Sequence, residues 1–231
     1  MNDEYLIESG ESENFIYRIE LEQFQDDSFD PRQWNNLGII ATWHRNYRLG
    51  DEQPQGEPID HMIGLIQKYD SILDKIEWYE DYDLDYTDMV YKMFNKYYVS
   101  LPVYMYDHGG ISISTGSFND SWDSGQLGFI YISKEQIRKE YNWKIITKKR
   151  KTEIEKYLNN EIEEYNNYLT GEVYCYVICN KKDPDNIIES CTGYLGYNNI
   201  EFMKKECEDL LLQFENEKEE KEISYFTNLY K

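Results

Sequence analysis

The sequence has few basic residues, few cysteines and no long apolar run. Its 231 residues include 24 Lys and Arg against 45 Asp and Glu, a formal net charge of −21 at pH 7. A field of this sign repels nucleic acid and anionic membranes. We therefore expect no direct binding to nucleic acid or membrane. We expect instead a partner with a basic surface, and the commonest such surfaces belong to proteins that themselves bind nucleic acid.

The scarcity of cysteine argues against a metal centre or a disulfide framework. Of four cysteines, Cys175 and Cys179 lie four apart in YCYVIC, while Cys191 and Cys207 stand alone. This spacing is a poor zinc pattern. No apolar run approaches the roughly 18 residues of a membrane span, and the opening MNDEYLIESGESEN lacks the features of a secretion signal. We expect a cytoplasmic protein with reduced thiols, no metal and no cofactor.

The patterning of apolar residues predicts an α+β fold. We expect an antiparallel sheet of about six strands with four or five packed helices, because strands and helices do not alternate strictly. Residues 1–13 should form an acidic, mobile N-terminus, and residues 14–231 a single domain with 58–98 as a helical insertion. The predicted strands are 15–24, 37–43, 101–106, 127–132, 172–182 and 187–196, and the predicted helices are 60–76, 88–98, 134–141, 147–169 and 200–222.

Local signals refine these elements. Asp60 should cap the first helix, and Ser133 with Gln136 should form a capping box. Pro102 suits a strand start, and DPDN at 183–186 suits a hairpin turn. The Gly-, Ser-, Asn- and Asp-rich stretch 107–126 predicts a hairpin tip and a long loop.

Three blocks resemble a widespread family of small acidic proteins from phages, prophages and other mobile elements. PRQWNNLGIIATWHRNYRLGDE is similar to its WDNLGxMxxxHxRYxLGD block. LPVYMYDHGGISISTGSFNDSWDSGQLGFIYISKEQIRKEY is similar to its YDHSG…WDSGQVGxIYxSKExxRKEY block, and YLTGEVYCYVI followed by ESCTGYLG to its YLTGEVYGY block. Asn35, Thr192 and Gly193 depart from the family pattern. The resemblance implies no agreed activity. It implies an accessory gene acting in a host bacterial cell, from a pool rich in inhibitors of host defence.

The stretch EWYEDYDLDYTD at 77–88 is the leading candidate for partner binding. Its carboxylates form a negative column in either a helical or an extended backbone, comparable in density to the phosphates of a nucleic-acid strand. Its tyrosines could pack where bases or sugars would lie. The alternative is a solvated loop between two helices. The candidate contacts are Glu77, Tyr79, Glu80, Asp81, Tyr82, Asp83, Asp85, Tyr86 and Asp88.

A second set of candidates lies in loops. His44, His61 and His108 are the residues that titrate near neutrality without special tuning. His44 and His108, with Asp123 and the neighbouring Asp51 and Asp107, could bind a divalent metal or form a hydrolytic site. Alternatively, the histidines could be hydrogen-bonded loop residues. Trp122 and Gln126 in WDSGQ could bind a peptide or base, or Trp122 could be a packed anchor of a turn.

The sequence therefore predicts a protein that binds rather than catalyses. The hypothesis is a phage or mobile-element inhibitor of a bacterial defence system, of anti-CRISPR or anti-restriction type. It would act as an acidic nucleic-acid mimic in the basic groove of a Cas effector or restriction nuclease. One alternative is an enzyme that uses His44, His108 and Asp123 against a nucleotide signal or host factor. Another is an accessory phage replication protein whose acidic C-terminal helix makes the contact.

Overall fold

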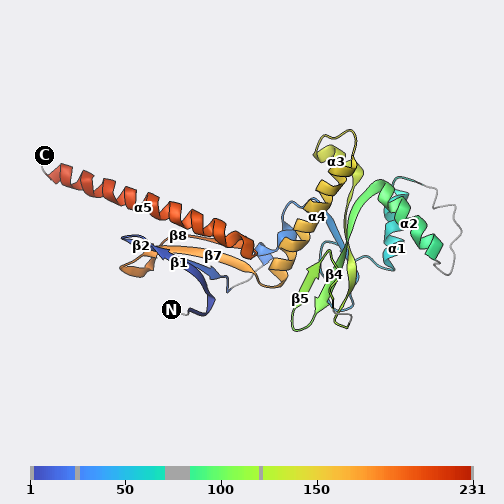
Figure 1. Ribbon diagram of the computed structural model, residues 1–231, viewed down its shortest axis with the longest axis horizontal. Helices are drawn as coiled ribbons and strands as arrows, with labels where there is room; N and C mark the ends of the chain where they lie inside the picture. The colour runs from blue at the N-terminus through green and yellow to red at the C-terminus, as the bar shows by residue number, and fades with distance from the viewer. Residues whose placement is uncertain (1–2, 24–26, 71–83, 120–121, 230–231) are drawn as a thin grey trace. The chain divides into compact units, whose positions relative to one another are not determined.

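The chain forms two compact units, one built from both ends of the sequence and one from its middle (Figure 1). The computed structural model describes residues 3–23, 27–70, 84–119 and 122–229. The terminal unit contains residues 1–30 and 167–231, and the central unit contains residues 31–166. Within the described residues there are eight strands in two antiparallel sheets and five helices. The α+β class is confirmed, but two units replace the single domain that we expected.

The terminal unit is a four-stranded sheet with one long helix on one face. Its order is β1-β2-β7-β8. The side chains of Tyr17 and Ile19 on one face of β2 form a core with Met203 and Cys207 of α5. Figure 1 shows α5 along the sheet, with its C-terminal turns continuing past the strands. The elements are β1 (Leu6–Glu11), β2 (Phe15–Leu21), β7 (Val173–Asn180), β8 (Asp183–Leu195) and α5 (Ile200–Leu229).

Two expectations for this unit are wrong. Residues 6–11 form strand β1, which pairs with β2 as an antiparallel hairpin, so the unstructured N-terminus that we expected contains a strand. The turn between β7 and β8 lies at Lys181 and Lys182, where Asn180 is the register partner of Asp183. The DPDN sequence therefore lies within β8. The amide of Lys181 donates to the Asn14 carbonyl at 2.9 Å, which holds this turn beside the β1–β2 connection.

The central unit is a sheet between two layers of helices. The order is β3-β6-β4-β5. Helices α1 and α2 form a core with Phe129 and Tyr131, and Leu158 of α4 lies close to Ile130 on the other face. Figure 1 shows these helices on opposite sides of the sheet. The elements are β3 (Ile39–Thr42), α1 (Pro58–Gln67), α2 (Leu84–Tyr97), β4 (Tyr98–Asp107), β5 (Ile111–Ser114), β6 (Ser124–Ser133), α3 (Lys134–Glu140) and α4 (Lys148–Leu169).

Some local expectations for this unit also change. Glu57 rather than Asp60 is the N-cap of α1, and Asp60 completes the reciprocal capping box from the third helical position. The Ser133 cap is confirmed, since its Oγ accepts from the Gln136 amide at 3.1 Å. Strand β5 lies inside the predicted loop 107–126. Pro102 lies in the middle of β4, not at its start. Strand β6 pairs with this part of β4, but β5 reaches only residues 104–107. On the β5 side no neighbouring strand therefore needs the backbone N–H that proline lacks.

Candidate partner-binding site

The acidic stretch 77–88 falls largely outside the described residues, so Glu77, Tyr79, Glu80, Asp81, Tyr82 and Asp83 stay predictions. The backbone of Asp85 lies in the first turn of α2. Asp88 is exposed. Tyr86 packs against the α1–α2 core, and burial followed by the charge of Asp60 raises its pKa. Tyr86 therefore packs within the fold while staying partly exposed, and its role as a partner contact stays a prediction.

The sheet of the central unit gathers the loop candidates at one end. Because β6 is antiparallel to both β3 and β4, the C-terminal ends of β3 and β4 lie beside the start of β6. Thr42 pairs with Gly128, where a Cβ atom would lie only 2.0 Å from the Ala41 carbonyl oxygen. Glycine at 128 thus lets β3 approach closely. The resulting loop face consists of His44, Tyr47, Asp107, His108, Trp122, Asp123 and Gln126.

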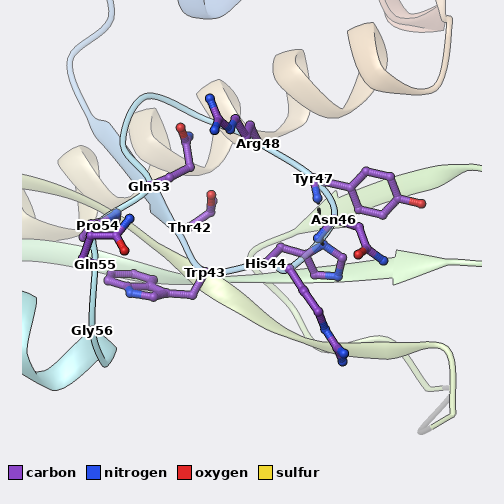
Figure 2. Close-up of a pocket in the computed structure, with 11 residues that line it drawn as sticks. Thr42, Trp43, His44, Asn46, Tyr47, Arg48, Gln53, Pro54, Gln55 and Gly56 are labelled. Atoms are coloured by element: carbon purple, nitrogen blue, oxygen red, sulfur yellow. Dashed lines mark hydrogen bonds between the residues drawn. The ribbon is translucent and has the colours of Figure 1, made fainter.

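His44 organises the loop that follows β3. Its Nδ1 accepts hydrogen bonds from the amides of Asn46, at 3.3 Å, and Tyr47, at 3.2 Å. Its ring stacks on the Tyr47 ring with centroids 4.9 Å apart. Figure 2 shows the two side chains as neighbours. Because Nδ1 is an acceptor, the proton of the neutral ring lies on Nε2. Nδ1 is thus committed to the loop and is not free to act as a general base.

Tyr47 connects this loop to the end of β4. Interaction with the nearby Asp107 carboxylate, through hydrogen bonding and then through its charge, raises the pKa of Tyr47. The Asp107 amide in turn donates to the Asp123 carbonyl at 2.9 Å. Tyr47 was not a sequence-based candidate, whereas Asp107 was one of the loop aspartates considered with His108. The only sequence signal was the position of Asp107 directly before His108.

His108 and Asp123 form the pair that the sequence suggested. The distance from His108 Nδ1 to Asp123 Oδ2 is 2.9 Å, and 71% of the His108 side chain is exposed. An ion pair this open to water contributes little to stability. It also lacks the dry, enclosed surroundings in which a His–carboxylate pair usually catalyses. The geometry brings the two residues together without building a closed active site around them.

Trp122 is the most exposed large side chain of the loop face. Its relative exposure is 94%, so the interpretation of Trp122 as a packed anchor is wrong. Exposed tryptophan is costly to leave in water and is enriched among residues that dominate protein interfaces. Gln126 is also exposed, and its side-chain amide donates to the Gly128 carbonyl at 3.2 Å. Trp122 therefore resembles an interface anchor more than a structural residue.

Two open cavities flank His44. The smaller, of about 360 Å³, is lined by His44, Asp107, Trp122, Asp123 and Gln126 among others. The larger, of about 700 Å³, lies along residues 42–56. Figure 2 shows the Trp43 indole and the His44–Tyr47 pair toward opposite ends of it. Four of the five loop candidates thus line one cavity, and His108 reaches it only through Asp123.

The chemistry available at this face is limited. In the part of the chain that the structure describes, no group of three or more His, Cys, Asp or Glu side chains is placed to hold a metal. Asp51, which follows His44 in sequence, instead binds Arg32 through both carboxylate oxygens. His61 lies among Trp43, Phe129 and Tyr131. These contacts leave a face suited to recognition through aromatic, amide and charged groups.

Comparison of the chain with protein-family models, with curated proteins and with solved structures gives no match. Among the described residues, none of the helices combines the length and the apolar character needed to cross a membrane.

Proposed function

We propose that this protein is a phage or mobile-element inhibitor of a bacterial defence system that acts by binding. Its acidic surface would occupy the basic groove of a nuclease effector of the CRISPR or restriction type and exclude nucleic acid from it. Charge complementarity of this kind steers association and selects partners. The resemblance of three sequence blocks to accessory mobile-element proteins suggests the setting, and the charge distribution supports the mechanism.

The uneven distribution of charge is the observation that carries the proposal. The terminal unit has 23 acidic and 8 basic residues, while the central unit has 22 acidic and 16 basic residues. Helix α5 carries nine acidic and four basic residues, and its C-terminal half extends beyond the packed part of the helix. Its exposed carboxylates are Glu201, Glu208, Asp209, Glu217, Glu219, Glu220 and Glu222. These residues add a second acidic surface to the predicted column at 77–88.

The openness of the loop face also favours binding over catalysis. His108 is mostly exposed, and Nδ1 of His44 is engaged by backbone amides. Trp122 offers a large rigid contact surface beside them. A protein inhibitor needs such anchors surrounded by polar groups.

Stoichiometry tests the mechanism directly. A candidate nuclease is titrated with the purified protein, and cleavage of a labelled target is followed. A mimic should abolish cleavage at about one inhibitor per nuclease, should compete with the nucleic acid, and should lose potency as salt rises. Complete inhibition at a small fraction of one equivalent would contradict a mimic.

Charge reversal identifies the surface. We expect the variant with Asp81, Asp83, Asp85 and Asp88 each changed to Lys to lose inhibition. The matched control changes Glu208, Asp209, Glu219 and Glu220 to Lys, with the same change in charge on α5. If the four lysines disrupt α2, a variant with the same four aspartates changed to Asn is used in their place. Retained inhibition by a folded 81–88 variant would contradict the mimic role of that stretch, and loss only in the control would assign the contact to α5.

A second candidate function is an enzyme that uses His44, His108 and Asp123 against a nucleotide signal or host factor. The observation that favours it is that Asp123 bonds His108 and lines the same cavity as His44. An enzyme should act substoichiometrically, and the His44→Ala, His108→Ala pair should lose activity while keeping affinity for the partner. Unchanged activity in that variant would eliminate this candidate.

A further inference from the structure

One surface of the central unit has the opposite charge from the rest of the chain. Residues 134–156 contain nine Lys or Arg and four Glu, although the whole chain has a net charge of −21. These residues form α3, the connection to α4 and the first turns of α4, which lie beside each other in Figure 1. The α3–α4 basic patch consists of Lys134, Arg138, Lys139, Lys144, Lys148, Lys149, Arg150, Lys151 and Lys156.

Three of the nine cations are used within the fold. The Lys134 ammonium donates to the carbonyls of Asn95 and Lys96 at the end of α2. Lys151 pairs with Glu155 at 3.2 Å. Arg150 donates to the Ile145 carbonyl at 2.8 Å. The other six cations are all exposed, and none of them forms an ion pair with a carboxylate among the described residues. They are Arg138, Lys139, Lys144, Lys148, Lys149 and Lys156.

A stacked aromatic group holds this surface in shape. The rings of Tyr141 and Trp143 stack with centroids 4.6 Å apart, and the Arg150 guanidinium lies 4.5 Å from the Trp143 centroid on α4. The Trp143 amide also donates to the Arg138 carbonyl at 3.1 Å. The connection is therefore fixed to both helices. Neighbouring positive charges of Lys151 and Arg138 contribute, after burial, to lowering the pKa of Lys134, so the cations are close together.

The position of these cations opposes the stability of α4. Lys148, Lys149, Arg150 and Lys151 occupy the first turn, which has no acidic residue. Positive side chains there are unfavourable beside the positive end of the helix dipole, by about 0.3–1 kcal/mol each. A charge arrangement that works against the local structure is expected where function requires it.

We propose that the α3–α4 basic patch binds the phosphate backbone of duplex nucleic acid without reading its sequence. Lys148 and Lys156 are separated by about 12 Å along α4 at 1.5 Å per residue. This length covers about three phosphate steps of a duplex strand. Six exposed cations within the 23 residues 134–156 supply the positive charge that a phosphate backbone attracts.

A membrane surface fits the patch less well. Stable membrane binding needs apolar side chains that enter the bilayer in addition to cations. In residues 134–156, Ile145 is the one large aliphatic side chain that is mostly exposed, at 69%. The patch therefore offers charge without the apolar area of an anchor. The expectation that the protein avoids nucleic acid came from its total charge, which averages over this surface.

The inference does not rest on the proposed function, because the test uses no nuclease. The full chain is titrated into a fluorescein-labelled DNA duplex of about two helical turns at about 50 mM salt and anisotropy is measured, with repeats up to about 200 mM. We expect the duplex to bind, with a logarithm of the association constant that falls linearly with the logarithm of salt concentration. The Lys148→Glu, Lys149→Glu variant should bind at least about tenfold more weakly, and its salt slope should be smaller by about 2.

The matched control is Lys205→Glu, Lys221→Glu, which makes the same charge change at two exposed positions of α5. It should weaken binding less than about threefold. If circular dichroism shows that the Lys148→Glu, Lys149→Glu variant is misfolded, the Lys148→Gln, Lys149→Gln variant is used in its place. Parallel titrations use phosphatidylserine vesicles and polyglutamate. The proposal is overturned by no duplex binding at about 50 mM salt, by equal weakening in the control, or by binding to vesicles or polyglutamate but not to duplex.

Discussion

The guanidinium of Arg32 donates to both carboxylate oxygens of Asp51, with distances of 3.1 Å from Nε and 2.6 Å from Nη2. The Arg32 side chain is only 4% exposed. It also donates to Glu161 of α4 at 3.3 Å and to the Gly38 carbonyl at 2.8 Å. Both acids accept backbone amides as well, Asp51 from Ile40 and Glu161 from Leu37. This buried hub connects the entry to β3 with α4.

Removing Arg32 should destabilise the protein strongly. In Arg32→Met the carboxylates of Asp51 and Glu161, whose side chains are 25% and 14% exposed, lose their cation. Breaking one side of a buried ion pair typically costs about 3–5 kcal/mol. Because Asp51 keeps some contact with water, we expect the free energy of unfolding to decrease by about 3 kcal/mol. Urea denaturation measures this decrease. The exposed Arg45→Met should change it by less than about 0.5 kcal/mol. A loss below about 1 kcal/mol in Arg32→Met would contradict the role of the hub.

His61 should make stability depend on pH. Burial against Trp43, Phe129 and Tyr131 lowers its pKa below 6.5, partly opposed by Glu52. The unfolded chain then takes up a proton at higher pH than the folded chain. The contribution of neutral His61 to the free energy of unfolding is therefore constant above about pH 6.5. It falls as the pH drops through the lowered pKa of His61 in the folded chain.

The change is measured as the urea midpoint between about pH 7.5 and 5. His61→Phe should remove this part of the slope, whereas His108→Phe, at an exposed position, should keep it. An identical pH profile for His61→Phe and the unmodified protein would refute the assignment.

The cysteines should differ in reactivity. Burial, followed by the charges of Glu22 and Glu20, raises the pKa of Cys175 to about 12, and burial raises that of Cys207 to about 12. Cys179 is buried and Cys191 is exposed. Since the thiolate is the reactive form, Ellman's reagent at pH 8 should modify Cys191 rapidly and the other three only on unfolding. Cys191→Ser should lose the fast phase, and its persistence would be contrary to this ordering.

The first turn of α4 should gain stability when its charge is reversed. Lys148→Glu replaces an unfavourable cation at the positive end of the helix by a favourable anion, so we expect a gain of about 1 kcal/mol. For a chain of this size that corresponds to a rise of a few degrees in melting temperature by differential scanning calorimetry. Lys205→Glu, in α5 away from its ends, should shift it much less. A decrease for Lys148→Glu would show that Lys148 stabilises the fold, contrary to our argument.

Trp122 should matter for partner binding and not for stability. Because it is almost fully exposed, Trp122→Ala should change the free energy of unfolding by less than about 0.5 kcal/mol. If the loop face contacts the partner, affinity should fall by about 2 kcal/mol or more, as for other tryptophan anchors. Trp34→Ala, at a half-exposed position outside the loop face, is the control in a calorimetric titration. Equal affinities for the two variants would exclude Trp122 as an anchor.

Local patterns in the sequence predicted the elements well. The alternation from Phe15 and the 3.6-residue spacing from Ile154 to Tyr165 identified β2 and α4, because each pattern reflects which side chains face a core. The Ser133 cap was also visible. The ends of elements were less predictable. Glu57 and Asp60 form one reciprocal box, and sequence alone does not show which of the two begins the helix.

The loop candidates were only partly predictable. His44, Asp123, Trp122 and Gln126 were chosen as polar or aromatic residues in loops, but nothing in the sequence places His44 near a loop about 80 residues later. The antiparallel pairing of β3 and β4 with β6 does this. The interaction of Tyr47 with Asp107 follows from the same pairing. The α3–α4 basic patch was visible in the sequence but was hidden by averaging charge over the whole chain.

The sequence by itself determined the α+β class, most helices and strands, and the overall negative charge. These follow from local propensity, periodicity and composition, which do not depend on distant residues. The tertiary structure decided that the chain ends pair through β2 and β7, that Arg32 is buried between two acids, and that most of the acidic excess belongs to the terminal unit. Those results depend on contacts between residues far apart in sequence, whose partners no local pattern specifies.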